Sequence, residues 1–330
     1  MRMLKTIVQN KTEMEQLKND PFIARWRNNY TLNLQSGIFS DERSRPLMYI
    51  MNTQPYRSPV IVLAAAGPSL DKNISILKKY RNNFLLFCAD IVLFRFVQEG
   101  IIPDFVVNID PQEEISNHWR GIDTSKSVLI CPTSTSPHTI NTWQGRILFF
   151  NQTDILGTPK GEALKQIISP TQNFGNIFNR FFVGATMLQA SLYFQPSKLI
   201  LIGYDFAYTD DKAYCDGLLD FKVDHTLLTK GTPEYDGFIE QLKQLIIKKE
   251  QKVVIDNQEI WTSKLFIFYK QVFLDLIFKY RLSVINATEG GILREIDCMS
   301  LESALQQYCV NQIEKVDIFA LPKRKRGRRR

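Results

Sequence analysis

The sequence predicts an α/β protein built on a doubly wound, mostly parallel sheet, with helices on both faces and a small N-terminal arm. Three observations support this fold class. Continuous apolar runs, such as residues 60–66, suit strands that are covered on both faces. Amphipathic helical segments alternate with these runs, as they do in parallel sheets. Glycine-containing or acidic turns follow several runs directly.

The N-terminal part differs from the rest of the chain. Residues 1–55 are polar and irregular, and we expect an arm or cap there, with one helix over residues 11–28. The first strand, residues 60–66, comes next. An amphipathic helix follows its turn, begins near residue 74 and ends at the asparagine pair 82–83.

The later elements repeat this alternation. We expect strands over residues 84–89, 105–109, 127–131, 147–150, 199–202 and 281–287, and helices over residues 90–99, 184–194 and 261–280. Gly100 ends the first of these helices. Ala185 and Ala190 let the second pack closely, and the third is long and rich in aromatic residues. We therefore expect an α/β domain over residues 56–292, a helical segment over 293–322 and a basic tail over 323–330.

The composition limits the classes of partner. The chain has 330 residues, of which 44% are hydrophobic and 23% charged, which is typical of a folded globular protein. Its net charge of +7 arises in the tail, where residues 323–330 supply seven of the 41 basic residues and leave 34 against 34 acidic ones. A basic face for nucleic acid over the whole domain is therefore not expected; only the tail has the charge to touch nucleic acid or an anionic membrane.

The sequence lacks the patterns of transmembrane, secreted, disulfide-bonded and zinc-binding proteins. It has no run of 18 apolar residues and no secretory signal pattern, so we expect no transmembrane segment and a cytoplasmic location. Its five cysteines are widely spaced and form no CxxC pair, which favours buried free thiols. The three histidines, His118, His138 and His225, lack metal-binding spacing, so a zinc site is not expected.

The candidate site consists of the polar residues that follow the expected strands, because ligands of open α/β sheets bind at the carboxyl ends of the strands. The candidates for nucleotide binding are Gly67, Pro68, Ser69, Asp90, Asp110, Gln112, Thr288, Gly290 and Gly291, and those for catalysis are Asp205, His225 and Glu289. A glycine turn before a helix offers amide N–H groups to a phosphate. Carboxylates at neighbouring strand ends can bind ribose, hold a divalent cation or accept a proton. Ordinary turns, helix caps and a surface histidine are the structural alternatives.

Four segments, read in order, resemble the motility accessory factor family: residues 65–71, 102–112, 202–210 and 286–291. The resemblance covers roughly residues 56–292. Members of that family are glycosyltransferases implicated in attaching nonulosonic, sialic-acid-like sugars to flagellin, and their central domain is similar to family-42 sialyltransferases with a Rossmann-like sheet. The same superfamily includes a 6-hydroxymethylpterin diphosphokinase with an MptE-like domain, which uses ATP and magnesium. Its acidic metal motif is thinned here to Asn108-Ile109-Asp110-Pro111-Gln112.

The resemblance implies a transferase that moves a nonulosonic sugar from a CMP-linked donor to a hydroxyl of a protein or glycan acceptor. In this reading the CMP phosphate lies over the turn 67–69, Asp90 and residues 288–291 hold cytidine and ribose, and Asp205 or His225 deprotonates the acceptor. An ATP-dependent diphosphokinase acting on a pterin is the alternative enzyme, and magnesium is the candidate cofactor, with no assigned ligands. A nucleotide-binding or interaction protein without catalysis is the alternative outside the enzymes.

Overall fold

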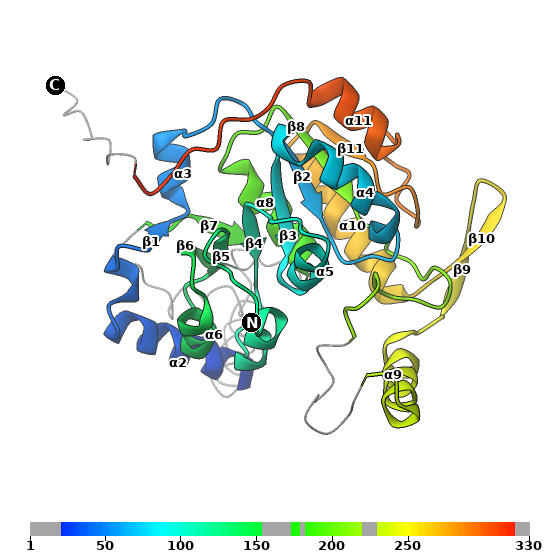
Figure 1. Cartoon of the computed structure of the whole chain (residues 1–330), viewed down its shortest axis with the longest axis horizontal. Helices are drawn as coiled ribbons and strands as arrows, with labels where there is room; N and C mark the ends of the chain where they lie inside the picture. The colour runs from blue at the N-terminus through cyan, green and yellow to red at the C-terminus, as the bar shows by residue number, and fades with distance from the viewer. Residues whose placement is uncertain (1–20, 154–172, 179–181, 220–229, 321–330) are drawn as a thin grey trace, which may run out of the picture.

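A sheet of parallel strands forms the centre of the fold. The computed structural model describes residues 21–153, 173–178, 182–219 and 230–320. Figure 1 shows the sheet with helices on both sides. In spatial order its strands are β1 (Ser44–Pro46), β6 (Arg146–Thr153), β5 (Val128–Pro132), β4 (Phe105–Val107), β3 (Leu85–Ala89), β2 (Val60–Ala64), β8 (Lys198–Ile202) and β11 (Val284–Asn286), and β7 (Asn176–Phe178) pairs with β6. Neighbouring strands of this sheet pair in parallel throughout the described residues.

Each central strand buries both of its faces, which explains the unbroken apolar runs. In β2, Ile61 and Leu63 enter one core, and Val62 and Ala64 enter the other. The first core lies under α3 (Met48–Thr53), α8 (Val183–Leu192) and α10 (Lys264–Lys279); the second lies under α2 (Pro21–Gln35), α4 (Leu70–Tyr80), α5 (Leu93–Gln98), α6 (Pro137–Thr142) and α11 (Leu301–Tyr308). Helices on both faces of a parallel sheet confirm the predicted fold class.

The path of the chain creates a switch point beside β2. From β2 the strands proceed through β3, β4, β5 and β6 toward one edge, and the chain then returns to place β8 on the other side of β2. The loops after β2 and β8 therefore leave the sheet side by side and diverge to opposite faces. In folds of this type a crevice opens at that point.

Short 3-10 helices join several of these elements. They are η1 (Ile38–Ser40), η2 (Arg81–Asn83), η3 (Asp90–Val92) and η4 (Glu113–Trp119). The predicted helix over 90–99 is in fact η3 followed by α5. The predicted helix over 74–83 is α4, which begins earlier, at Leu70, followed by η2. Helix α4 starts directly after the glycine turn because residues 67–69 already adopt turns that lead into it.

The prediction of a helix over 261–280 places its start too early. Trp261 belongs to β10 (Gln258–Thr262), which pairs antiparallel with β9 (Gln251–Ile255). The tip of this hairpin is Asp256-Asn257, both with positive φ, a turn sequence that favours two-residue hairpins. The Ser263 side chain then accepts a hydrogen bond from Phe266 N and caps α10.

The N-terminal segment contributes to the main sheet, because β1 forms its edge strand next to β6. Helix α2 continues to Gln35, beyond the predicted end at residue 28, and residues 1–20 lie outside the described ranges. Of the predicted helical segment 293–322, residues 301–308 form α11. The proposed domain boundaries stay a prediction.

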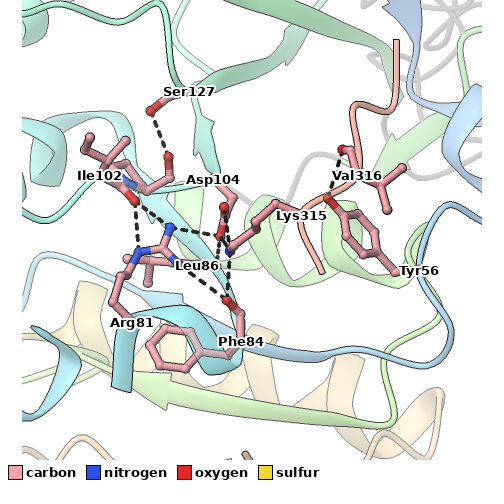
Figure 2. Close-up of polar contacts among 10 residues, drawn as sticks. Tyr56, Arg81, Phe84, Leu86, Ile102, Asp104, Ser127, Lys315 and Val316 are labelled. Atoms are coloured by element: carbon pink, nitrogen blue, oxygen red, sulfur yellow. Dashed lines mark hydrogen bonds and ion pairs between the residues drawn. The ribbon is translucent and has the colours of Figure 1, made fainter. Parts of the chain in front are cut away.

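A C-terminal strap, residues 309–320, crosses the amino ends of the central strands and is held there by an ion-pair cluster (Figure 2). Asp104, just before β4, accepts hydrogen bonds from Arg81 Nη2 at 2.9 Å and from Lys315 Nζ at 2.7 and 2.8 Å. Its Oδ2 also accepts the amide of Leu86 at 2.8 Å. Tyr56 Oη donates to Val316 O at 3.4 Å. This cluster fastens the strap at the end of the sheet opposite the carboxyl ends.

All five cysteines lie in the described residues and none forms a disulfide. Four of them are buried, as expected of thiols used as small apolar residues, and Cys298 is exposed. Within the described ranges, no helix combines the length and the apolar character needed to cross a bilayer.

Candidate functional site

A cavity of about 370 Å³ lies at the switch point. Its lining comes from the carboxyl ends of four neighbouring strands: Ala65–Gly67 after β2, Asp90 and Ile91 after β3, Asn108–Asp110 after β4, and Gly203–Ala207 after β8. Of the predicted site residues, Gly67, Asp90, Asp110 and Asp205 line it. The parallel register brings them together although up to 138 positions separate them in the chain.

Asp205 is the most deeply held carboxylate of the cavity, with 2% of the residue exposed. Ser69 donates two hydrogen bonds to it, from Oγ at 2.7 Å to Oδ2 and from its amide at 3.2 Å to Oδ1. Burial raises the pKa of Asp205 to about 6 even though the Ser69 hydrogen bonds lower it. A carboxylate with this pKa exchanges a proton readily near neutral pH, which suits a general base.

The turn at residues 67–69 is shaped around that carboxylate. A Cβ on Gly67 would lie 1.9 Å from Asp205 Oδ2 and 2.6 Å from Gly203 O, so a side chain has no room there. The Gly67 amide donates to Gly203 O at 2.9 Å, and the Ser69 amide donates to Asp205. These amides are the ones expected to bind a phosphate, and in the structure they donate to Gly203 O and to the carboxylate of Asp205. The phosphate contact of this turn stays a prediction.

Pro68 and Ser69 do not line the cavity. Their effect on a ligand is indirect, because the turn that they form fixes the orientation of Asp205. We therefore treat Ser69 as a positioning residue for that carboxylate. The sequence signal for the turn was correct, but its partner is a side chain of the protein.

Asp90 forms a second polar cluster on the opposite wall. Its Oδ2 accepts a hydrogen bond from Asn108 Nδ2 at 3.0 Å and lies 3.2 Å from His118 Nδ1, and its Oδ1 accepts the Ile91 amide at 2.9 Å. Burial alone would raise the pKa of Asp90, but the His118 charge and the three donors together hold it below its usual value. The contact with the Asp90 carboxylate orients the His118 ring at the cavity wall.

Sequence reasoning missed both partners of Asp90. His118 lies in η4 and lines the cavity, but no local sequence pattern connects it to a residue 28 positions earlier. Asn108 is fully buried, and its Oδ1 has no hydrogen-bond partner in the described structure. The amide nitrogen of Asn108 is therefore the group that acts here, because it holds Asp90 Oδ2. The Asn-x-Asp pattern after β4 was the available signal for Asn108.

Asp110 is the third carboxylate of the cavity. The Gln112 amide donates to its Oδ1 at 2.9 Å. Burial raises its pKa above the usual value, and the nearby charge of Asp90 adds to this rise. Gln112 itself does not line the cavity but contacts Asp110, and its contact with a nucleotide stays a prediction.

The predicted segment 288–291 lies behind Asp205 and not in the cavity. Thr288 Oγ1 accepts the Tyr204 amide at 3.2 Å, and a Cβ on Gly291 would lie 2.0 Å from Asp205 O. Gly290 packs in the same way, since its Cβ would lie 3.0 Å from Ser69 Cβ. These residues support the Asp205 loop, and their contact with cytidine and ribose stays a prediction.

Glu289 is also displaced from the site. Its Oε1 accepts the Leu301 amide at 2.8 Å, at the start of α11, and a hydrogen bond from Asn73 Nδ2 at 3.3 Å. The carboxylate therefore caps a helix, which is the alternative to its predicted catalytic role. His225, the other catalytic candidate, lies outside the described residues.

Aromatic side chains form the remaining wall of the cavity. Phe182 stacks on Tyr269 with ring centroids 4.8 Å apart, and Tyr204, Phe206 and Tyr214 also contribute. Sequence reasoning missed this wall because its residues come from four separate segments. Such faces can stack on a nucleobase.

The first turn of α8 opens on the same cavity. Val183 and Gly184 line it, and the N-terminus of a helix attracts anions. A Cβ on Gly184 would lie 2.7 Å from the Phe182 ring and 2.9 Å from that of Tyr204, so glycine allows the helix to start against the aromatic wall. The cavity thus combines a ring-binding face with an anion-attracting helix end.

The carboxylates of the cavity do not form a metal centre. In the part of the chain that the structure describes, no three His, Cys, Asp or Glu side chains are grouped closely enough to hold a metal ion. Asp90, Asp110 and Asp205 each accept hydrogen bonds from protein donors instead. The donor set does not fit a protein-held magnesium site, and we derive no step through one.

Comparison with known proteins places this geometry in context. A family model described as 6-hydroxymethylpterin diphosphokinase MptE-like matches residues 33–211. An uncharacterized protein of Treponema pallidum (strain Nichols) is 35% identical over 88 residues, which cover 26% of this chain and 38% of that protein. The solved structure of a Maf glycosyltransferase from Magnetospirillum magneticum AMB-1 superposes with a TM-score of 0.50 at 13% identity, covering 79% of this chain and 38% of that one. The matched part thus covers 38% of each of these two proteins, and the second likeness is one of fold.

Proposed function

Because the chain belongs to the 6-hydroxymethylpterin diphosphokinase MptE-like family, we propose that it is a nucleotide-dependent transferase, and first a glycosyltransferase that uses a CMP-linked nonulosonic sugar. The observation that carries this proposal is the pairing of Asp205 with the Asp90–His118 cluster across one aromatic-walled cavity. The Maf glycosyltransferase of similar fold supports sugar transfer over the alternatives. The acceptor that we propose is a hydroxyl of a protein or glycan.

The volume and chemistry of the cavity suit such a donor. At about 370 Å³ it falls within the range of small-molecule sites. The cytosine ring would stack on the wall formed by Phe182 and Tyr269, and the phosphate would lie at the first turn of α8.

The transfer step needs one base and one source of positive charge. Asp205, ionised above its pKa of about 6, takes the proton of the acceptor hydroxyl. The acceptor oxygen forms a bond to the anomeric carbon as the bond from that carbon to the CMP phosphate oxygen breaks, which inverts the centre. CMP leaves with the electron pair of the broken bond. His118, held by Asp90, and the α8 N-terminus stabilise its negative charge.

Diphosphoryl transfer to a pterin is the second candidate, which the family description favours. There the pterin hydroxyl would attack the β-phosphorus of ATP, AMP would leave, and Asp205 would again accept the proton. Magnesium in such reactions can be held largely by the phosphates with few protein ligands.

Ligand-dependent melting separates these candidates. The full chain is heated alone, with CMP, and with ATP and magnesium, and ligand binding to the folded state raises the melting temperature. We expect a shift with CMP, followed by release of CMP from CMP-N-acetylneuraminic acid. A shift only with ATP and magnesium would reject sugar transfer in favour of the diphosphokinase. Binding of CMP without turnover of any donor would favour a nucleotide-binding protein without catalysis.

A matched pair of variants tests the role of Asp205. Asp205→Asn keeps the shape of the side chain but cannot accept the proton, so we expect CMP release to fall by about a hundredfold or more while CMP still binds. Asp297→Asn changes an exposed carboxylate away from the cavity and should release CMP at the wild-type rate. Equal rates in Asp205→Asn and wild type would remove Asp205 from the mechanism.

A further inference from the structure

A second cavity of about 280 Å³ lies beside the first, between the loop of residues 211–219 and helix α9 (Pro233–Ile246). Helix α9 projects away from the sheet together with the β9–β10 hairpin (Figure 1). The apolar residues that line this cavity are Leu218, Leu219, Tyr235, Ile239, Ile246 and Ile247. The apolar face of α9 therefore encloses a space that its own side chains do not fill.

The two cavities share a wall. Ala213 and Tyr214 line both of them. Burial raises the pKa of Tyr214, so it is a neutral phenol at neutral pH, and no hydrogen bond joins its hydroxyl to another described residue. A molecule bound in the second cavity would therefore lie next to Tyr214 and could extend beyond it into the first cavity.

The shared wall is fixed to the switch point. The Cys215 amide donates to Ala66 O at 2.9 Å, directly after β2. The Asp216 amide donates to Asp71 Oδ2 at 2.9 Å, on the first turn of α4. These two bonds attach the 211–219 loop to the segment that contains the turn that positions Asp205.

The rim of the second cavity is electrically balanced. Lys212 pairs with Asp216 at 2.7 Å, and Lys243 pairs with Glu240 at 3.4 Å. Lys230 at the same rim also has an interaction partner. A site for an anionic ligand would offer unmatched positive charge, so this rim favours an uncharged occupant.

The size of the cavity limits that occupant. An apolar protein cavity of about 150 Å³ holds one benzene molecule, so about 280 Å³ accommodates roughly two fused rings. We infer that this cavity is the acceptor subsite of the proposed transferase and takes an uncharged apolar group of one or two rings that carries the acceptor hydroxyl. Of the two acceptors proposed above, a protein hydroxyl on an aromatic side chain fits this cavity and a glycan hydroxyl does not. The binding of an apolar ring in this cavity does not depend on the proposed function. The statement that the ring belongs to the acceptor rests on the proposed function.

The test uses 2-naphthol as the probe, a two-ring molecule with one hydroxyl, and measures its binding to the full chain by calorimetry. Ile239→Trp fills the cavity from α9, and Gln241→Trp adds the same ring on the exposed side of that helix. We expect 2-naphthol to bind the wild type at one site. Its Kd should rise by about tenfold or more in Ile239→Trp and stay unchanged in Gln241→Trp.

CMP is titrated into the same three proteins as an independent readout. Its affinity should not change in either variant, because neither residue lines the first cavity. Should Ile239→Trp fail to fold, Ile246→Trp fills the same space from the next turns of α9. A wild type that does not bind 2-naphthol, or a cavity-filling variant that binds it as tightly, would overturn the inference. Failure of CMP to bind the wild type, with the expected 2-naphthol results, would count against the proposed function alone.

Discussion

Asp205→Asn should make the protein more stable at neutral pH while it abolishes turnover. The carboxyl is 2% exposed, and burial raises its pKa to about 6 from an ordinary value of 3.8. Between these two pH values the folded protein holds a proton that the unfolded chain has lost. The free energy of unfolding therefore falls as the pH rises through that window.

The magnitude follows from the size of the shift. A difference of about two pKa units, at about 1.4 kcal/mol each, amounts to about 3 kcal/mol of stability that is present below pH 4 and lost above pH 6. The amide that replaces the carboxyl in the variant would stay neutral at every pH. It can still accept the Ser69 amide on its oxygen and donate to Ser69 Oγ through its nitrogen, because a hydroxyl can act in either role.

Urea denaturation of wild type and variant measures this difference. At about pH 4 the two free energies of unfolding should agree closely, and at about pH 7.5 the variant should be more stable by about 3 kcal/mol. Asp297→Asn, at an exposed site, should differ from the wild type by the same small amount at both pH values. A variant-minus-wild-type difference that does not change with pH would refute the reasoning.

Three further changes test other parts of the structure. Gly67→Ala places a Cβ 1.9 Å from Asp205 Oδ2, so it should cost about 2 kcal/mol or more in urea denaturation and remove the CMP-dependent melting shift; an undiminished shift would contradict this. His118→Gln removes the imidazole that contacts Asp90 Oδ2, so kcat for CMP release should fall by about a hundredfold with little change in melting temperature; an unchanged kcat would exclude His118 from the reaction. Asp104→Ala leaves two cations without their carboxylate (Figure 2) and should lower the free energy of unfolding by about 2 kcal/mol, since the cluster is only partly screened by solvent; a loss below about 0.5 kcal/mol would show that the strap is held by other contacts.

The candidate site could be predicted in part because strand ends are visible in the sequence. Gly67, Asp90, Asp110 and Asp205 each follow an apolar run, and parallel register brings such positions to one edge of the sheet. Residues 288–291 follow β11 in the same way, but β11 is at the edge of the sheet. Their loop packs behind Asp205 and so does not reach the cavity.

Other residues of the site could not be predicted. His118 meets Asp90 only because η4 folds back over the end of β4, and the stacking of Phe182 on Tyr269 joins α8 to α10. No periodic pattern of residues in the sequence predicts such contacts between distant segments. The β9–β10 hairpin, by contrast, had a local signal in Asp256-Asn257 that the sequence analysis did not use.

The sequence by itself determined the alternation of strands and helices, the burial of both sheet faces and the position of a sharp turn at Gly67, because each depends on the chemistry of neighbouring residues. The tertiary structure alone decided which group occupies that turn. The Asp205 carboxylate, 136 positions from Ser69, accepts a hydrogen bond from Ser69, and Glu289 caps a helix. Hydrogen-bond partners and pKa values depend on which distant groups packing brings within about 3 Å and on how much water it removes, and neither quantity is contained in a local pattern of residues.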